Sequence, residues 1–307
     1  MWVYVFKKLI TLITIMFATT FIAFMILYWF ASFDPLLDKA IRGDSSYPYE
    51  VILYQLRELF GHNGHIIIRY VRYMAGIFTG DFGRSFSNNL PIAPLVMPSL
   101  LYTLQLGGIA LVISMVMAFS LTIFTMLRKS TLTRKVLIFI TQIGSSMPVF
   151  VTAIFLIILF LQTTWERIPS FNDGELILLP IIILSANMFF EITRTVQTSF
   201  LNIAGIDNVG ASPSKGLAEK RVVCKHVLRN ALVPTLSALQ THLGGFLAGI
   251  IMIESLLGLP GIGRITVQSA WGADYPLLLG CFVMIVFCGA LLSSLVDIFR
   301  TLILVEQ

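Results

Sequence analysis

The sequence predicts an all-α, polytopic membrane protein with six transmembrane helices, and three observations support this fold class. Of its 307 residues, 57% are hydrophobic and only 12% are charged, whereas a soluble globular domain carries roughly 25% charged residues. The apolar residues fall into long uncharged blocks. The short links between these blocks carry most of the basic residues, as they do in membrane proteins.

The uncharged blocks set the number of helices. Crossing a hydrocarbon core of ~30 Å takes about 20 apolar residues at a rise of 1.5 Å per residue. Five blocks reach this length, and the block 176–190 reaches it by continuing past Glu191. The six blocks are 9–33, 103–127, 136–164, 176–190, 231–253 and 277–296.

The placement of charge predicts the topology. Lys7 and Lys8 precede the first block, and basic residues fill the links 128–135 and 210–229, whereas the link 165–175 carries acidic residues. Short basic links remain in the cytoplasm. Both termini are therefore predicted to be cytoplasmic. This topology accounts for the basic residues, so we expect no nucleic-acid partner.

The chain divides into three predicted segments. Residues 1–33 form the N-terminal region and first helix, residues 34–98 form an external loop, and residues 99–307 form the core, with a cytoplasmic loop at 205–230. The external loop carries apolar residues at helical spacing, which predicts short amphipathic helices at the outer membrane surface. A turn is predicted after them because glycines interrupt the pattern. The two predicted helices and the turn cover residues 49–60, 65–78 and 79–86.

The stretch "ASPSKGLAEKRVVCKHVLRN" (211–230) is too polar to span a membrane. One interpretation is a solvated loop held inside by its positive charges. Another is a short amphipathic helix at the cytoplasmic surface that presents one face to a partner. Composition alone agrees with both interpretations.

Five motifs favour the second interpretation through their order and spacing. Lys215-Gly216 is followed nine residues later by "HVLRNALVP", and the others are "GDFGRSF" (80–86), "SMPVF" (146–150), "IESLLGLPGIGR" (253–264) and "DYP" (274–276). With these motifs the chain resembles, over almost its whole length, the B-type permease subunit of binding-protein-dependent ABC importers for oligopeptides, dipeptides or nickel. It departs from that pattern at Gln197, at Leu256 or Leu257, and after Asp297.

The resemblance implies a type I ABC importer permease fold in a prokaryotic cytoplasmic (inner or plasma) membrane. It implies as partners a second homologous permease, two ATP-binding subunits, an extracytoplasmic substrate-binding protein and the lipid bilayer. The chain has no Gly-x-x-x-x-Gly-Lys-Ser/Thr loop. We therefore expect no enzymatic activity and no cofactor in this chain, with ATP and Mg²⁺ bound by the partner subunits.

The resemblance also implies two contact regions. The cytoplasmic loop corresponds to a coupling helix that an ATPase subunit grips, and its small residues allow close backbone approach. The external motifs correspond to a region contacted by the binding protein. The ATPase-coupling candidates are Ala211, Ser212, Lys215, Gly216, Leu217, His226, Leu228 and Arg229, and the binding-protein candidates are Asp81, Gly83, Pro260, Gly261 and Asp274.

Polar residues inside the predicted helices are candidates for the translocation pathway or for a helix interface. A carboxylate within a membrane helix costs about 2.5–3.5 kcal/mol on insertion scales, so it is expected to face a partner or water. Arg194, one turn after Glu191, is the expected partner of that carboxylate. The candidates are Ser146, Pro148, Asn187, Glu191, Arg194 and Glu254.

Other functions fit the sequence less well. His62 and His65 lie in a glycine-rich turn without further ligands, so no metal site is predicted. Ser145 or Ser146 with His242 could suggest an intramembrane protease, but such an enzyme needs its serine and histidine in hydrogen-bond contact. A self-sufficient transporter should show inverted repeats, and none is apparent in the sequence. Peptides are favoured as substrate over nickel or a metal chelate, because the helices carry no cluster of His or Cys.

Overall fold

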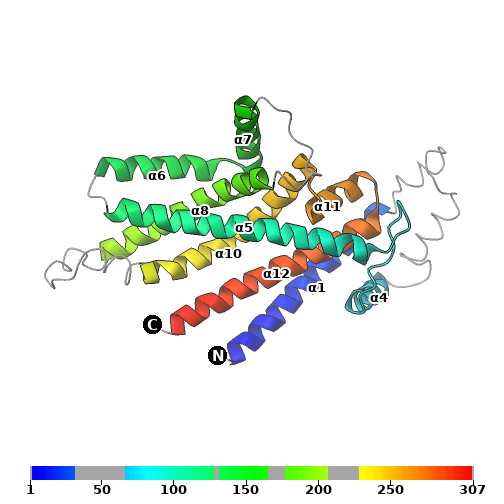
Figure 1. The fold of residues 1–307 in the computed structure, drawn as a ribbon. Coiled ribbons are helices and arrows are strands. Elements are labelled where there is room, and N and C mark those ends of the chain that lie inside the picture. Colours follow the sequence, from blue (N-terminus) through cyan, green and yellow to red (C-terminus); the bar gives the residue numbers. More distant parts are fainter. Residues whose placement is uncertain (1, 32–65, 128–130, 165–176, 207–227, 306–307) are drawn as a thin grey trace. The chain divides into compact units, whose positions relative to one another are not determined.

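The computed structural model describes residues 2–31, 66–127, 131–164, 177–206 and 228–305. This part of the chain is helical, apart from turns and one isolated antiparallel bridge between Arg84 and Pro91, so the predicted fold class is confirmed. The helices are α1 (Trp2–Ala31), α4 (Ile66–Phe78), α5 (Ile92–Leu127), α6 (Thr131–Ser146), α7 (Val149–Thr164), α8 (Leu178–Ile206), α10 (Leu228–Leu257), α11 (Ile262–Trp271) and α12 (Tyr275–Val305) (Figure 1).

Within the described residues, five helices are long and apolar enough to cross a membrane, or six if the bent pair α6 and α7 counts as one span. The five spans lie in α1, α5, α8, α10 and α12, at Ile10–Leu27, Ile92–Thr125, Leu178–Ser199, Leu232–Leu257 and Tyr275–Ile303. These spans fall on five of the six blocks predicted from the sequence.

The third block does not form the single helix expected over residues 136–164. It forms α6 and α7, which meet at an angle of 106°. Pro148 lies at the break, where it has no backbone N–H to donate and disfavours helical geometry at the residue before it. The hydroxyls of Ser145 and Ser146 donate to the carbonyl of Gln142, a type of contact that bends helices.

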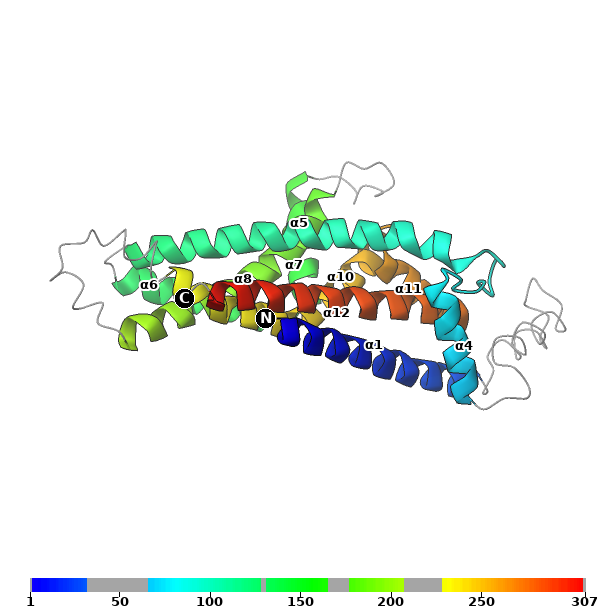
Figure 2. The same ribbon diagram turned by 90° about the horizontal axis from the view of Figure 1, so that it is seen from below.

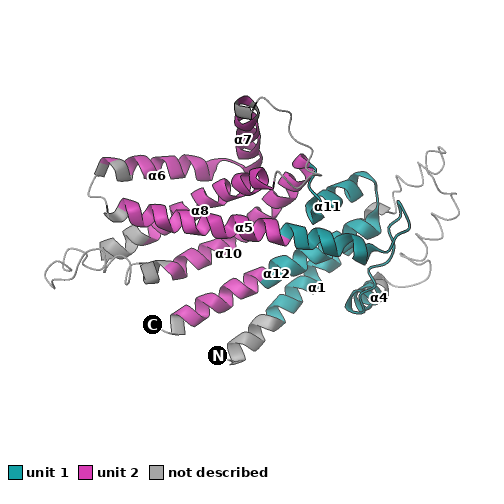
Figure 3. Ribbon diagram, viewed as in Figure 1, with its two compact units in different colours: residues 1–103, 258–291 teal, residues 104–257, 292–307 magenta. Residues whose placement is uncertain are grey.

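The structure forms two compact units (Figure 3). Unit 1 consists of residues 1–103 and 258–291, and unit 2 of residues 104–257 and 292–307. The predicted segments 1–33, 34–98 and 99–307 follow membrane topology rather than compactness, and they stay a prediction.

In unit 1, α4 packs against α1 (Figure 2). The Tyr70 hydroxyl donates to the carbonyl of Phe17 at 2.8 Å and is also hydrogen-bonded to the Thr20 hydroxyl. Phe24 and Met74 are buried in the same cluster. The predicted helix at 65–78 is thus confirmed as α4, and the predicted helix at 49–60 lies outside the described residues.

The turn predicted at 79–86 follows α4 directly. Gly80 and Gly83 adopt φ values of +84° and +80°, in the left-handed region that glycine enters without steric cost. The Asp81 carboxylate accepts a hydrogen bond from the backbone N–H of Gly83 at 2.9 Å. The chain then turns back, and the Ile92 N–H donates to the carbonyl of Gly83 at the start of α5.

In unit 2, α8 packs against α6, α7 and α10. Close approach depends on small residues, as is common between membrane helices. Gly144 of α6 faces the Phe190 ring of α8, and Gly249 of α10 faces Val149 of α7. The Ser114 hydroxyl of α5 donates to the carbonyl of Ser185 on α8 at 3.0 Å. These contacts place α8 at the centre of the unit.

Candidate functional site

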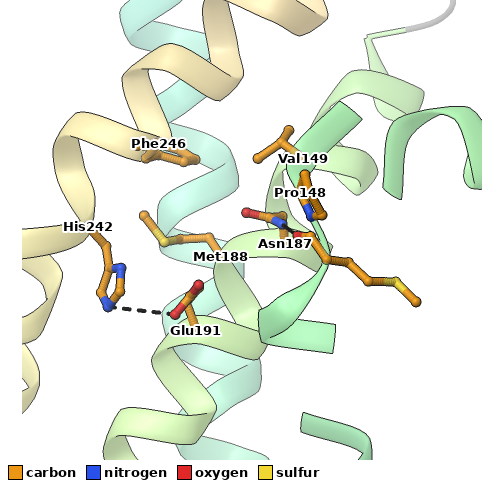
Figure 4. Close-up of a pocket in the computed structure, with 9 residues that line it drawn as sticks. Pro148, Val149, Asn187, Met188, Glu191, His242 and Phe246 are labelled. Carbon is orange, nitrogen blue, oxygen red and sulfur yellow. Dashed lines mark hydrogen bonds and ion pairs between the residues drawn. The ribbon is translucent and has the colours of Figure 1, made fainter. Parts of the chain in front are cut away.

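The candidate site is a cavity of about 190 Å³ in unit 2, where the break between α6 and α7 meets α8 and α10 (Figure 4). Its lining combines apolar side chains, two of them methionines, with three polar side chains. The lining residues are Met147, Pro148, Val149, Asn187, Met188, Glu191, His242, Gly245 and Phe246.

Helical spacing brings the polar groups together. Asn187 and Glu191 are four residues apart on α8, and His242 and Phe246 are four apart on α10, so each pair shares one helix face. The Asn187 side-chain N–H donates to the carbonyl of Met147 at 3.2 Å. This bond satisfies a carbonyl that the break in the helix would otherwise leave without a partner.

Glu191 and His242 face each other across the cavity (Figure 4). The Glu191 Oε2 lies 3.6 Å from the His242 Nε2, which makes an ion pair when the imidazole is protonated. The side chains are 21% and 34% exposed, respectively. The Glu191 Oε2 itself is buried, and it has no hydrogen-bond partner among the residues that the structure describes.

The expected pairing of Glu191 with Arg194 is wrong. The guanidinium of Arg194 donates to the Ser145 hydroxyl of α6 at 3.4 Å, and the residue placed opposite Glu191 is His242 of α10. Spacing along α8 predicts a neighbour on the same helix, whereas the side chains that meet here come from different helices. His242 also lies three residues before Gly245, where two adjacent glycines open the face of α10.

Three of the six pathway candidates, Pro148, Asn187 and Glu191, line the cavity. Ser146 lies one residue outside the lining and bonds to Gln142, and Glu254 is fully buried further along α10. Sequence reasoning did not select His242, Met188 or Phe246 for the pathway. The one available signal was their helical spacing relative to Glu191 and to the glycines of α10.

The contacts also bear on the protease alternative. The hydroxyls of Ser145 and Ser146 donate to the Gln142 carbonyl, whereas the imidazole of His242 faces Glu191. A serine nucleophile requires its histidine within hydrogen-bond reach. Within the described helices, no hydrogen bond joins His242 to Ser145 or Ser146.

In unit 1, Asp274 is hydrogen-bonded to several residues of the loop that precedes α5. Asp274 is 2% exposed, and its carboxylate accepts hydrogen bonds from the Ser85 hydroxyl, from the Phe86 N–H, and from the Ser87 N–H and hydroxyl. Asp274 is thereby placed in a structural role in this loop, and its predicted contact with the binding protein stays a prediction. Of the other candidates in this region, Gly261 is buried, Gly83 is partly exposed, and Asp81 and Pro260 are exposed.

Comparison with known proteins identifies the family. The model of the family described as "Binding-protein-dependent transport system inner membrane component" matches residues 110–304, a region that contains the whole cavity. The chain belongs to this family. It is therefore a multi-pass transmembrane permease of an ABC importer, and the predicted resemblance is confirmed.

Three relatives illustrate the range of the family. The permease is 28% identical to the probable peptide ABC transporter permease protein y4tP of Sinorhizobium fredii, over 99% of this chain and 98% of the relative. It is 27% identical to the nickel import system permease protein NikB of Staphylococcus aureus, over 96% of this chain and 89% of the relative. It is 31% identical to the dipeptide transport system permease protein DppB of Lactococcus lactis, over 75% of this chain and 76% of the relative.

The predicted coupling segment of the permease joins two helices that line the cavity. Helix α8 ends at Ile206 and α10 begins at Leu228. Leu228 and Arg229 therefore lie in the first turn of α10. The other coupling candidates, together with the two histidines of the external turn, lie outside the described residues; they are Ala211, Ser212, Lys215, Gly216, Leu217, His226, His62 and His65.

Proposed function

We propose that this permease forms half of the translocation pathway of an ATP-driven peptide importer. Its partners would be a second homologous permease, two ATP-binding subunits that carry ATP and Mg²⁺, and an extracytoplasmic binding protein. The assembly would lie in a prokaryotic cytoplasmic membrane, with both termini of this chain inside. The observation that carries the proposal is the cavity at the α6–α7 break, which is lined by the two helices that lead into the predicted coupling segment.

The connectivity supports the coupling role. Helix α8 carries Asn187 and Glu191, α10 carries His242 and Phe246, and residues 207–227 join the two helices. A displacement of this connection would act on both walls of the cavity, because its two ends are the helices that carry the lining residues. Binding and hydrolysis of ATP on the partner subunits would then alternate the access of the cavity between the two sides of the membrane.

The composition of the cavity supports a peptide as the substrate. Met147, Met188 and Phe246 offer adaptable apolar contacts, and the amide of Asn187 and the carboxylate of Glu191 offer hydrogen-bonding groups. Two of the three relatives above are named as peptide or dipeptide permeases.

The alternative is nickel or a metal chelate, since a third relative is named as a nickel permease. Of the cavity residues, Glu191 and His242 are of metal-ligating types. Across the described parts of the chain, no group of three or more His, Cys, Asp or Glu side chains is arranged to hold a metal ion. A bare metal ion bound by protein groups needs more ligands than two.

Uptake by the reconstituted importer tests the proposal. The permease is assembled in liposomes with its partner subunits and binding protein, and the accumulation of a labelled tripeptide and of labelled Ni²⁺ is measured with and without ATP. We expect tripeptide accumulation that requires both ATP and the binding protein. Nickel accumulation in its place would select the alternative substrate. Solute movement by the permease alone, with no partner, would contradict the proposal as a whole.

A further inference from the structure

The cavity contains a carboxylate, that of Glu191, which a cationic hydrogen-bond donor would stabilise. Glu191 lies within the candidate span Leu178–Ser199. An ionisable side chain inside a membrane span has a high free-energy cost, so such residues usually have a partner or a function. The Glu191 Oε2 is buried and lacks a hydrogen-bond partner among the described residues. A buried carboxylate oxygen without a hydrogen bond is costly, so a donor that reaches it gains binding free energy.

His242 satisfies this carboxylate incompletely. The distance of 3.6 Å between Nε2 and Oε2 is longer than a charge-assisted hydrogen bond, which spans about 2.7–2.9 Å. The imidazole is also partly exposed to the cavity. The Glu191 side chain is itself partly exposed and lines the cavity, so a further donor can approach its carboxylate group from there.

A second acceptor lies on the same face of α8. The Asn187 side-chain N–H is engaged by the Met147 carbonyl, which turns the amide oxygen toward the other lining residues (Figure 4). One turn later the Glu191 carboxylate faces the same cavity. Two acceptors at this spacing suit a group with several N–H donors and a positive charge.

The remaining walls suit a cation attached to an apolar body. Phe246 offers an aromatic ring, whose face attracts ammonium groups, and Met147 and Met188 offer polarisable thioethers. An anionic group would instead meet the Glu191 carboxylate, which repels it. The chemistry of the cavity thus selects by charge.

We propose that Glu191 and Asn187 form a binding site for a primary ammonium group of the transported substrate. This inference rests on the proposed peptide import. The N-terminal ammonium of a peptide is the group of this chemistry that every unmodified linear peptide with a free N-terminus carries. His242 positions the Glu191 carboxylate from the opposite helix. The site makes the permease itself, and not only a binding protein, selective for a free amino group.

Direct binding of two small probes tests the site independently of transport. Benzylammonium and benzyl alcohol have the same ring and similar size but differ in charge. Saturation-transfer NMR measures the contact of each probe with the importer, assembled with its partner subunits in lipid nanodiscs, after subtraction of the signal from empty nanodiscs. We expect a signal for benzylammonium that exceeds the benzyl alcohol signal.

The variant Glu191→Gln keeps the shape of the side chain and removes its charge. We expect it to lower benzylammonium binding about tenfold, as the loss of one charge-assisted hydrogen bond does, and to leave the benzyl alcohol signal unchanged. The matched control is Thr198→Val, on the same helix but outside the cavity, where the hydroxyl bonds to the carbonyls of Arg194 and Thr195. This control is expected to bind both probes as the parent protein does.

Several outcomes would overturn the inference. They are equal signals for both probes in the parent protein, no signal for either probe, or an equal loss of both signals in Glu191→Gln, which would indicate a merely structural role. If Glu191-dependent binding appears but peptide uptake does not, the ammonium site stands and the peptide substrate is wrong. If uptake occurs and binding does not depend on Glu191, only the site is wrong.

Discussion

Ser85 and Asp274, which are 189 residues apart in the sequence, are joined by a buried hydrogen bond from the serine hydroxyl to the carboxylate. Asp274 also receives hydrogen bonds from Phe86 and Ser87, so one side chain fixes the loop before α5 against the turn before α12. Both segments belong to unit 1. The motifs "GDFGRSF" and "DYP" therefore have a shared structural role in holding this part of the permease together.

Replacing Asp274 tests this role. Asp274→Ala removes the acceptor of the buried Ser85 hydroxyl and of the partly buried donors of Phe86 and Ser87, so we expect the free energy of unfolding to fall by about 3 kcal/mol. The midpoint of thermal unfolding of the purified permease in detergent measures the change. Asp81→Ala is the control, because Asp81 is exposed and has one recorded bond, to the N–H of Gly83. Equal effects of the two substitutions would contradict the role of Asp274.

Two tyrosines of α4 form a natural matched pair. The Tyr70 hydroxyl bonds to Phe17 and Thr20 of α1, whereas the buried Tyr73 hydroxyl has no hydrogen-bond partner within the described structure. Burial raises the pKa of both tyrosines above 10.0, so both stay neutral. Tyr70→Phe is expected to cost about 1 kcal/mol of stability and Tyr73→Phe to be neutral or stabilising. Thermal unfolding compares the two variants, and the reverse order would show that the Tyr70 bonds do not hold α4.

The contact of α6 with α8 depends on a missing side chain. A Cβ atom at Gly144 would overlap the ring of Phe190, whereas a Cβ atom at Gly108 of α5 would meet open space. Gly144→Ala is expected to destabilise the permease by about 1–3 kcal/mol through overpacking. Gly108→Ala is expected to be neutral or slightly stabilising, because alanine favours a helix. The same thermal unfolding assay distinguishes them, and a harmless Gly144→Ala would mean that α6 and α8 pack differently.

The coupling hypothesis predicts a separation of ATP hydrolysis from transport. Gly216→Trp places a large side chain where the predicted coupling segment approaches the ATPase subunit, so close backbone approach is lost. We expect the reconstituted importer to lose most of its substrate uptake and the stimulation of its ATPase activity by loaded binding protein. Uptake and ATP hydrolysis are measured on the same liposomes. Full coupling in this variant would rule out a contact at Gly216.

Much of the architecture follows from the sequence alone. Whether a block enters the membrane depends on the transfer free energies of its own residues, which is why the spans of α1, α5, α8, α10 and α12 fall on predicted blocks. The turn after α4 is likewise local, because glycines at residues 80 and 83 permit the left-handed backbone found there. The order and spacing of the motifs also indicated the family.

Tertiary structure alone decided which side chains meet. The sequence paired Glu191 with Arg194, a neighbour on the same helix, whereas the fold places His242 of α10 opposite the carboxylate. No local pattern links Asp274 to Ser85, 189 residues away, whereas the fold joins the two by a buried hydrogen bond. The physical reason is that contacts between helices depend on how their surfaces fit, through positions such as Gly144 against Phe190, and no local property of a single helix encodes that fit.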